Sequence, residues 1–191
     1  MTSEVLINPE KSVEWYNWSW EKSGWHDPAA EEGIRHLYVL QELRHLKVDT
    51  ILDVCCGQGT FLTLCERLGF TGYGFDFSSV AINIAKQNNK LENVWVGDAL
   101  DKKNYDGEYD AYVSIQVLEH IEKDIDVILN LKPNTPFVFS VPNWAHPGDE
   151  HVRKFVSDES IHRRYGGIVD IKTIQTFGNR RVVVSKTRSN V

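Results

Sequence analysis

Short apolar runs alternate with segments of helical periodicity along most of the chain, and this alternation is the feature that most restricts the possible folds. The first unit is an apolar run at 50–54, a glycine-containing turn, and a helix-patterned segment at 60–68 that stops at Gly69. Further apolar runs follow at 71–77, 93–96, 109–115 and 136–141. Parallel strands need long crossovers, which helices supply, so the pattern predicts an α/β fold with a mostly parallel sheet and helices on both faces.

The remaining segments complete this pattern. Helices are expected at 80–87 after a cap at Ser78 or Ser79, and at 122–131 before Pro133. A short helix runs from a Ser157 cap to Tyr165 in this interpretation. Two final strands, joined by a Gly178-Asn179 turn, read as a hairpin over 168–176 and 180–185.

The N-terminal region 1–48 differs in composition from the rest. It carries four of the six tryptophans, Trp15, Trp18, Trp20 and Trp25, followed by a helical pattern over 28–46. A segment of this length cannot hold a core of its own. We therefore expect an aromatic-rich helical lid or cap over a single ligand-binding domain at 49–191.

Composition excludes several classes of protein. The three cysteines include the adjacent pair Cys55 and Cys56, a poor disulfide framework, which indicates a reduced, cytoplasmic setting. No apolar run reaches the length of about 20 residues that a membrane span needs, and the N-terminus lacks the pattern of a secretory signal. The formal charge of −6 argues against a nucleic-acid partner. We expect a monomer or homodimer that acts on a small molecule.

Candidate ligand-binding residues cluster where the first strand ends. Asp53 lies near that end, and Gly57 and Gly59 follow in the turn. A dinucleotide site would need a third glycine at the position of Leu62, and a carboxylate beside the turn would repel a pyrophosphate. S-adenosylmethionine has no phosphate and carries a cationic ammonium and sulfonium, so the acidic turn favours this cofactor over NAD.

Two further aspartates follow the second and third strands. Asp76 is placed to accept hydrogen bonds from ribose hydroxyls, and Phe77 beside it to pack on the adenine. Asp98 is expected to accept a bond from the adenine amino group, and the Ala99 N–H to meet a ring nitrogen. The carboxyl ends of parallel strands share one edge of a sheet, which predicts that the three aspartates face one site.

The ordered motifs resemble the class I, Rossmann-like methyltransferase superfamily that uses S-adenosylmethionine. They are Asp53 to Gly59, Gly74-Phe75-Asp76, Gly97-Asp98-Ala99 and Val117-Leu118-Glu119-His120. Val141-Pro142-Asn143 and His151 to Phe155 are similar to its small-molecule branch, which includes ubiquinone-type and sugar O-methyltransferases.

The resemblance covers about 48–187 and implies a three-layer fold. Its seven-stranded, mostly parallel sheet would have the order 3-2-1-4-5-7-6, with the last strand antiparallel. It also implies cofactor contacts from Cys55, Gln116 and Val117. Cys55 stands where the family usually has its first glycine, so a side chain occupies a position where the backbone normally approaches the cofactor.

Candidate general bases lie after the fourth and fifth strands. We favour His120 and His151, with His146 as a third candidate, and Glu119, Asp149 and Glu150 have suitable chemistry as well. Glu119 and His120 could equally serve as a helix cap. No zinc-type spacing is present, so no metal is expected. Trp25, Trp144 and Asn143 are the expected substrate contacts.

These observations predict an enzyme that transfers a methyl group from S-adenosylmethionine to an oxygen or nitrogen of a small molecule, such as a sugar or metabolite hydroxyl. A non-catalytic binding module of the same fold remains an alternative, motivated by Cys55. A methyltransferase for protein or nucleic acid is another, although the Asn-Pro-Pro-Tyr signature of DNA amino-group methylation is missing after the fourth strand.

Overall fold

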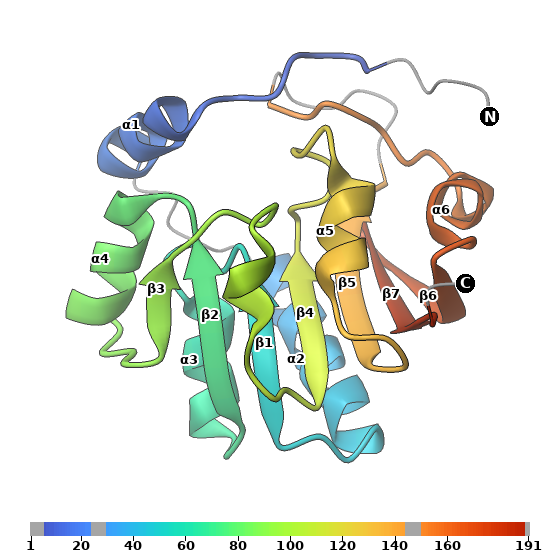
Figure 1. Cartoon of the computed structure of the whole chain (residues 1–191), viewed down its shortest axis with the longest axis horizontal. Coiled ribbons are helices and arrows are strands. Elements are labelled where there is room, and N and C mark those ends of the chain that lie inside the picture. Colours follow the sequence, from blue (N-terminus) through green and yellow to red (C-terminus); the bar gives the residue numbers. More distant parts are fainter. Residues whose placement is uncertain (1–5, 24–29, 144–149, 190–191) are drawn as a thin grey trace.

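The computed structural model describes residues 6–23, 30–143 and 150–189. Within these ranges seven strands form one sheet in the order β3-β2-β1-β4-β5-β7-β6 (Figure 1). Strands β1 to β5 are parallel, and β7 is antiparallel to both β5 and β6. This confirms the predicted fold class. The strands are β1 (Thr50–Val54), β2 (Thr71–Asp76), β3 (Val94–Val96), β4 (Ala111–Ile115), β5 (Pro136–Pro142), β6 (Val169–Phe177) and β7 (Arg180–Thr187).

The helices agree with the sequence pattern within a few residues, apart from two that it did not indicate. The unexpected elements are α1, which carries three of the N-terminal tryptophans, and the 3₁₀ helix η1 in a polar link. The helical elements are α1 (Val13–Ser23), α2 (Ala30–His45), α3 (Thr60–Arg67), α4 (Ser79–Gln87), η1 (Lys102–Tyr105), α5 (Asp124–Asn130) and α6 (Asp158–Tyr165).

Side chains alternate between two apolar cores, one on each face of the sheet. In β1, Ile51 packs in the core that α2, α3 and α4 cover, whereas Leu52 packs in the core that η1, α5 and α6 cover. In β4, Val113 and Tyr112 divide in the same way. This period of two on strands buried from both sides explains why β1 and β4 are almost continuous apolar runs in the sequence.

The N-terminal region occupies two different places. Helix α2 packs on the sheet through Val39, Leu40 and Leu43. Helix α1 instead lies beside α4, above the carboxyl ends of the strands, and the chain before it crosses that same end of the molecule (Figure 1). There the Ile7 N–H donates to the Val152 carbonyl at 2.9 Å.

Among the described helices, none combines the length and the apolar character that crossing a membrane requires.

Candidate active site

A cavity of about 600 Å³ lies between the carboxyl ends of the strands and the N-terminal segment. The parallel strands β1, β2, β3 and β4 all end at this cavity, which brings together residues that are distant in the sequence. Most of the site residues expected from the sequence line it, namely Asp53, Cys55, Gly57, Asp76, Phe77, Asp98, Ala99, Gln116, Val117, His120 and His151.

Five expected site residues are not placed there. Gly59 precedes α3 with a φ of 77°, and a Cβ on it would come within 2.2 Å of Leu91 Cδ1, so this glycine serves the turn and its packing. Asn143 is not part of the cavity wall, and its backbone N–H donates to the Asn179 carbonyl at 2.8 Å. The other three lie outside the described residues: Trp25, Trp144 and His146.

Asp76 is buried and held in a fixed orientation. The Gly57 N–H donates to its Oδ2 at 3.0 Å, and the Ser78 N–H donates to its Oδ1 at 2.9 Å. Burial raises the pKa of Asp76 to about 6, although these two hydrogen bonds act in the opposite direction. Burial, and then the charge of Asp76, hold the pKa of Asp53 well above its usual range. A positively charged ligand would favour the ionised form of both groups, so the carboxyl groups make the cavity suited to a cationic ligand.

Two non-glycine residues adopt a left-handed backbone conformation directly after strands that end at the cavity. Cys55 follows β1 with a φ of 60°, and Gln116 follows β4 with a φ of 57°. This region normally favours glycine because a Cβ is strained there. A glycine at position 55 would adopt this conformation without that strain.

Glu119 is the most deeply buried acidic group of the cavity wall. The residue is 0% exposed, and within the described part of the chain no side chain or backbone group forms a hydrogen bond to either carboxyl oxygen. Burial raises the pKa of Glu119 to about 8, while its own backbone N–H and then the positive charge of Arg180 act in the opposite direction. A buried carboxyl group without hydrogen bonds is costly to the fold, which makes Glu119 a candidate for contact with a ligand in the cavity.

Two histidines lie next to Glu119. The rings of His120 and His151 meet edge to face with centroids 4.7 Å apart. Burial, and then His151, lower the pKa of His120 to about 3, and burial lowers the pKa of His151 as well. Both rings are therefore neutral at pH 7. His120 Nδ1 lies 3.0 Å from the Glu150 carbonyl, which can only accept, so Nδ1 carries the proton and Nε2 keeps its lone pair.

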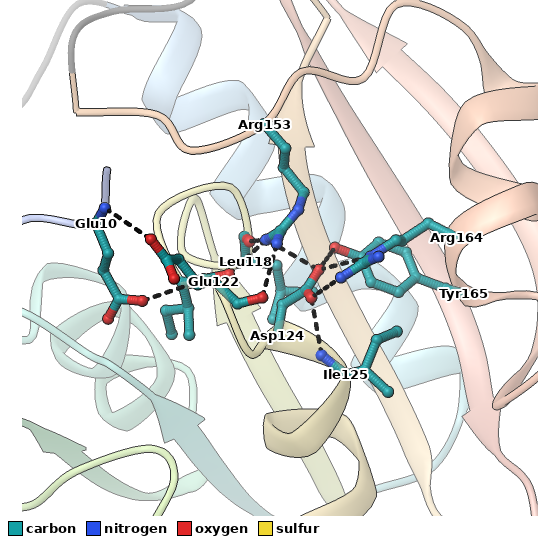
Figure 2. A network of polar contacts seen from close by, with 9 residues as sticks. Glu10, Leu118, Glu122, Asp124, Ile125, Arg153, Arg164 and Tyr165 are labelled. Carbon is teal, nitrogen blue, oxygen red and sulfur yellow. Dashed lines mark hydrogen bonds and ion pairs between the residues drawn. The ribbon is translucent and has the colours of Figure 1, made fainter. Parts of the chain in front are cut away.

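A buried ionic network holds the loop that carries Glu119 and His120 (Figure 2). The Arg153 guanidinium donates to the carbonyls of residues 118, 121 and 122, and pairs with Asp124 at 3.1 Å. Asp124 also accepts from Arg164 and from the Tyr165 hydroxyl. The loop is thus tied to α5 and α6, which fixes the direction of its side chains.

The N-terminal segment supplies residues to the cavity that the sequence analysis did not assign. The Tyr16 ring lies 5.1 Å from Phe77 and 6.2 Å from His120 between centroids. Trp20 covers the turn at Gly57, where a Cβ would come within 3.0 Å of the indole. The cluster of tryptophans in the sequence indicated that the N-terminal segment covers the cavity. No local sequence pattern indicated the other residues that line it, which include Arg35, His36 and Arg180.

Comparison with known proteins gives sequence relatives that are methyltransferases. A ubiquinone biosynthesis O-methyltransferase of Rickettsia akari is 30% identical over 148 residues, which is 67% of this chain and 56% of the relative. A 2-phytyl-1,4-naphtoquinone methyltransferase of Trichormus variabilis is 31% identical over 120 residues, or 56% of this chain and 52% of the relative. The chain thus matches little more than half of the length of these relatives.

Solved structures share the fold at lower identity. Magnesium protoporphyrin IX methyltransferase from Synechocystis PCC 6803 with bound SAH aligns with a TM-score of 0.70 at 16% identity, over 93% of this chain and 99% of that one. A putative methyltransferase in complex with the Haloferax volcanii Trm112 activator aligns with a TM-score of 0.73 at 15% identity, over 94% and 99%. A family model described as a methyltransferase domain matches residues 25–166, and the chain therefore belongs to the methyltransferase domain family.

Proposed function

We propose that this protein transfers a methyl group from S-adenosylmethionine to a small-molecule acceptor. The observation that carries the proposal is the position of Asp53, Asp76 and Asp98, which lie near, at and just beyond the ends of three adjacent strands and line one cavity. A cationic nucleoside without phosphates complements such a cavity, whereas the pyrophosphate of NAD would be repelled.

Different elements of the cavity wall would hold different parts of the cofactor. Asp76 at the end of β2 is oriented by two N–H donors, and its remaining lone pairs are suited to the ribose hydroxyls. Phe77 offers a ring for the adenine, with Asp98 and Ala99 at its polar edge. Asp53 near the end of β1 suits the ammonium group.

S-adenosylmethionine supplies an activated methyl group. An acceptor oxygen or nitrogen forms the new bond to the methyl carbon, the carbon–sulfur bond breaks, and sulfur keeps the electron pair as a neutral thioether. The acceptor proton leaves to a base, for which His120 and His151 are the candidates in the cavity wall. Holding the two reactants in line can lower the activation barrier by about 7–11 kcal/mol.

The N-terminal segment would act as a lid in this proposal. Tyr16 and Trp20 cover the cavity from α1, and residues 6–12 run on across it. Such a cover would exclude water and orient the acceptor. The acceptor class is supported by the relatives, whose names describe quinone methylation. We place the protein in the cytoplasm as a monomer or homodimer.

Calorimetric titration with S-adenosylhomocysteine, the demethylated product, tests the cofactor assignment. The wild type should bind it saturably, and Asp76→Ala should abolish binding. Asp106→Ala, which removes an exposed carboxylate outside the cavity, is the matched control and should bind like the wild type. Absence of binding by the wild type, or saturable binding of NAD instead, would reject the assignment.

A second experiment separates an enzyme from a binding module of the same fold. The protein is incubated with S-adenosylmethionine and a panel of phenols, sugars and amines, and release of S-adenosylhomocysteine is measured. Turnover with any acceptor supports the enzyme. Cofactor binding without turnover across the panel supports the non-catalytic alternative that Cys55 suggested.

A further inference from the structure

The charged residues of the cavity wall are separated along the sheet. Asp53, Asp76 and Asp98 lie at the side of β1, β2 and β3. Arg180 begins β7, on the far side of β4 and β5, and is the register partner of Pro142 at the end of β5. Neighbouring strands are about 4.8 Å apart, so three strand spacings place Arg180 roughly 14 Å from β1. The cavity therefore has an acidic end and an end that carries a guanidinium group.

Helix α2 brings a second guanidinium group to the β7 end of the cavity. Arg35 lines the cavity and is only 2% exposed. Tyr38, three residues further along α2, packs against Phe177 with ring centroids 5.0 Å apart, and Phe177 is the register partner of Arg180. Residues three apart on a helix lie on one face. Arg35 and Arg180 therefore reach the cavity from two elements that pack against each other, α2 and β7.

Both guanidinium groups act on the loop that carries the candidate bases. Burial raises the pKa of Glu119, while its own backbone N–H and then Arg180 and Arg35 act in the opposite direction. After burial, Arg180 also contributes to the lowered pKa of His120 and of His151. Interactions of this kind weaken with distance. A ligand group held by the arginines would therefore lie in the same part of the cavity as the methyl acceptor.

This end of the cavity also offers uncharged hydrogen-bond donors. With a pKa of about 8, Glu119 keeps its proton at pH 7 and can donate through its O–H. Burial, and then Arg35, lower the pKa of His36 to about 4, so its ring is neutral and donates one N–H. His36 follows Arg35 on α2 and lines the same cavity. An anion placed here could accept from charged and from uncharged donors.

The chemistry of these donors favours a carboxylate over a phosphate. Arginine stays charged at every physiological pH, and its planar fork matches the two oxygens of a carboxylate. Glu150 lines the cavity as well, with its Oε1 3.6 Å from His151 Nε2. Its repulsion, and that of the aspartates at the other end, increases with the charge of the ligand. A monoanion is therefore better suited to this site than a dianion.

We propose that the methyl acceptor carries a carboxylate and that Arg35 and Arg180 bind it. The inference rests on the proposed methyl transfer and names its acceptor class, a small organic acid with a hydroxyl or amine near the carboxylate. The carboxylate anchors the acceptor between α2 and β7. Its nucleophilic group then lies toward His120 and His151, between the anchor and the cofactor at the acidic end. A neutral molecule of the same shape lacks this anchor.

Matched acids and amides test the proposal on the full chain. The probe pairs are salicylate and salicylamide, mandelate and mandelamide, and lactate and lactamide, and calorimetry measures their binding with and without S-adenosylhomocysteine. At least one acid should bind about 10- to 100-fold more tightly than its amide, because hydrogen bonds between charged groups are the stronger ones. Equal affinities within all three pairs, or no binding of any acid, overturn the proposal. Tighter binding of phenyl phosphate than of every acid overturns the choice of a carboxylate.

Substitutions assign the preference to the two arginines. Arg35→Gln and Arg180→Gln should each reduce the preference for the acid by about tenfold, since each removes a charge-assisted donor. Arg35→Lys keeps the charge without the planar fork and should recover part of the preference. Arg163→Gln, at an exposed position on α6, is the matched control and should bind the acid like the wild type. An unchanged preference in both glutamine variants overturns the proposal.

Binding of S-adenosylhomocysteine separates this inference from the proposed function. Retained binding by Arg180→Gln shows that the variant is folded and that the acidic end is intact, so a lost preference for acids belongs to the arginine. A wild type that binds S-adenosylhomocysteine but does not distinguish acids from amides overturns the acceptor class and leaves the methyl transfer standing. A wild type that prefers acids but binds no S-adenosylhomocysteine rejects the methyl transfer and leaves the carboxylate site standing.

Discussion

At the residue scale, backbone strain is concentrated where the chain enters the cavity. Cys55 and Gln116 both hold positive φ angles at the ends of the adjacent strands β1 and β4. Strain of this kind persists only where the surrounding structure enforces it, and it gathers at ligand sites. Cys55 therefore holds a backbone geometry that glycine adopts more easily.

A pair of substitutions at Cys55 measures this strain. Cys55→Gly should be more stable than Cys55→Ala by about 1 kcal/mol, because left-handed backbone costs a residue with a Cβ about 1–2 kcal/mol. The alanine variant controls for loss of the thiol. Urea denaturation gives the two free energies of unfolding, and an alanine variant as stable as the glycine variant would show that no strain is stored there.

The raised pKa of Asp76 predicts how ligand affinity depends on pH. Protonation of Asp76 below its pKa of about 6 removes its acceptor capacity and its negative charge. S-adenosylhomocysteine affinity should therefore be constant near pH 7.5 and fall by up to about tenfold per unit below pH 6. Asp76→Asn should bind more weakly and show a flatter profile between pH 5 and 7.5. Parallel profiles for the two proteins would exclude Asp76 as the titrating group.

At the scale of single elements, the loop between β4 and α5 is held in place by ion pairs and side-chain hydrogen bonds and not by regular secondary structure. Arg153 and Asp124 are both buried, and together they tie the loop carbonyls to α6 through Arg164 and Tyr165 (Figure 2). This arrangement leaves the Glu119 and His120 side chains directed at the cavity. The network is therefore a scaffold for the site, since neither Arg153 nor Asp124 lines the cavity.

Removal of Arg153 should destabilise the fold strongly. Arg153→Ala leaves three loop carbonyls and part of the Asp124 charge without a partner, and breaking a buried pair in this way costs about 3–5 kcal/mol. Arg163→Ala on α6, an exposed position, is the control and should stay within about 0.5 kcal/mol of the wild type. Chemical denaturation measures both, and equal effects would mean that the network contributes nothing specific.

Helix α1 offers a similar test of the lid. Tyr16 packs against Phe77 and His120 at the cavity, whereas Trp18 on the same helix is 56% exposed. Tyr16→Ala should weaken S-adenosylhomocysteine binding by about 3- to 10-fold, because an aromatic pair is worth about 0.5–1.5 kcal/mol. Trp18→Ala should bind like the wild type. A larger loss from Trp18→Ala than from Tyr16→Ala would contradict the assignment of Tyr16 as cover.

At the scale of the whole molecule, a single bound ligand would contact most of the elements that meet at the cavity. The cavity wall takes residues from β1, β2, the loops after β3 and β4, and the N-terminal segment. A ligand that fills it contacts both apolar cores at their common end and the cover above them. Binding should therefore stabilise the fold as one unit.

Thermal unfolding tests this expectation. S-adenosylhomocysteine at about 100 times its Kd should add about 2.7 kcal/mol to the free energy of unfolding. For a chain of this size that corresponds to a rise in Tm of roughly 5–10 °C. Scanning fluorimetry with NAD at the same concentration is the control and should give no shift. The reverse pattern would contradict the cofactor assignment.

The sequence by itself determined the parts that depend on local pattern. Apolar runs such as 50–54 read as strands because a strand buried on both faces has no polar side, and Ser157 read as a cap because its hydroxyl can satisfy a free N–H; the capping box at α6 confirms this. The parallel arrangement then placed Asp53, Asp76 and Asp98 at one edge, since parallel strands share their carboxyl ends.

Only the tertiary structure decided which distant segments meet. Tyr16 covers the cavity, Arg153 braces the loop at 118–122, and His151 lies against His120 because the chain folds back on itself there. Gly59 does not line the cavity, and a Cβ on it would meet Leu91. No local spacing encodes such contacts, since they are fixed by packing between elements that are far apart in the sequence.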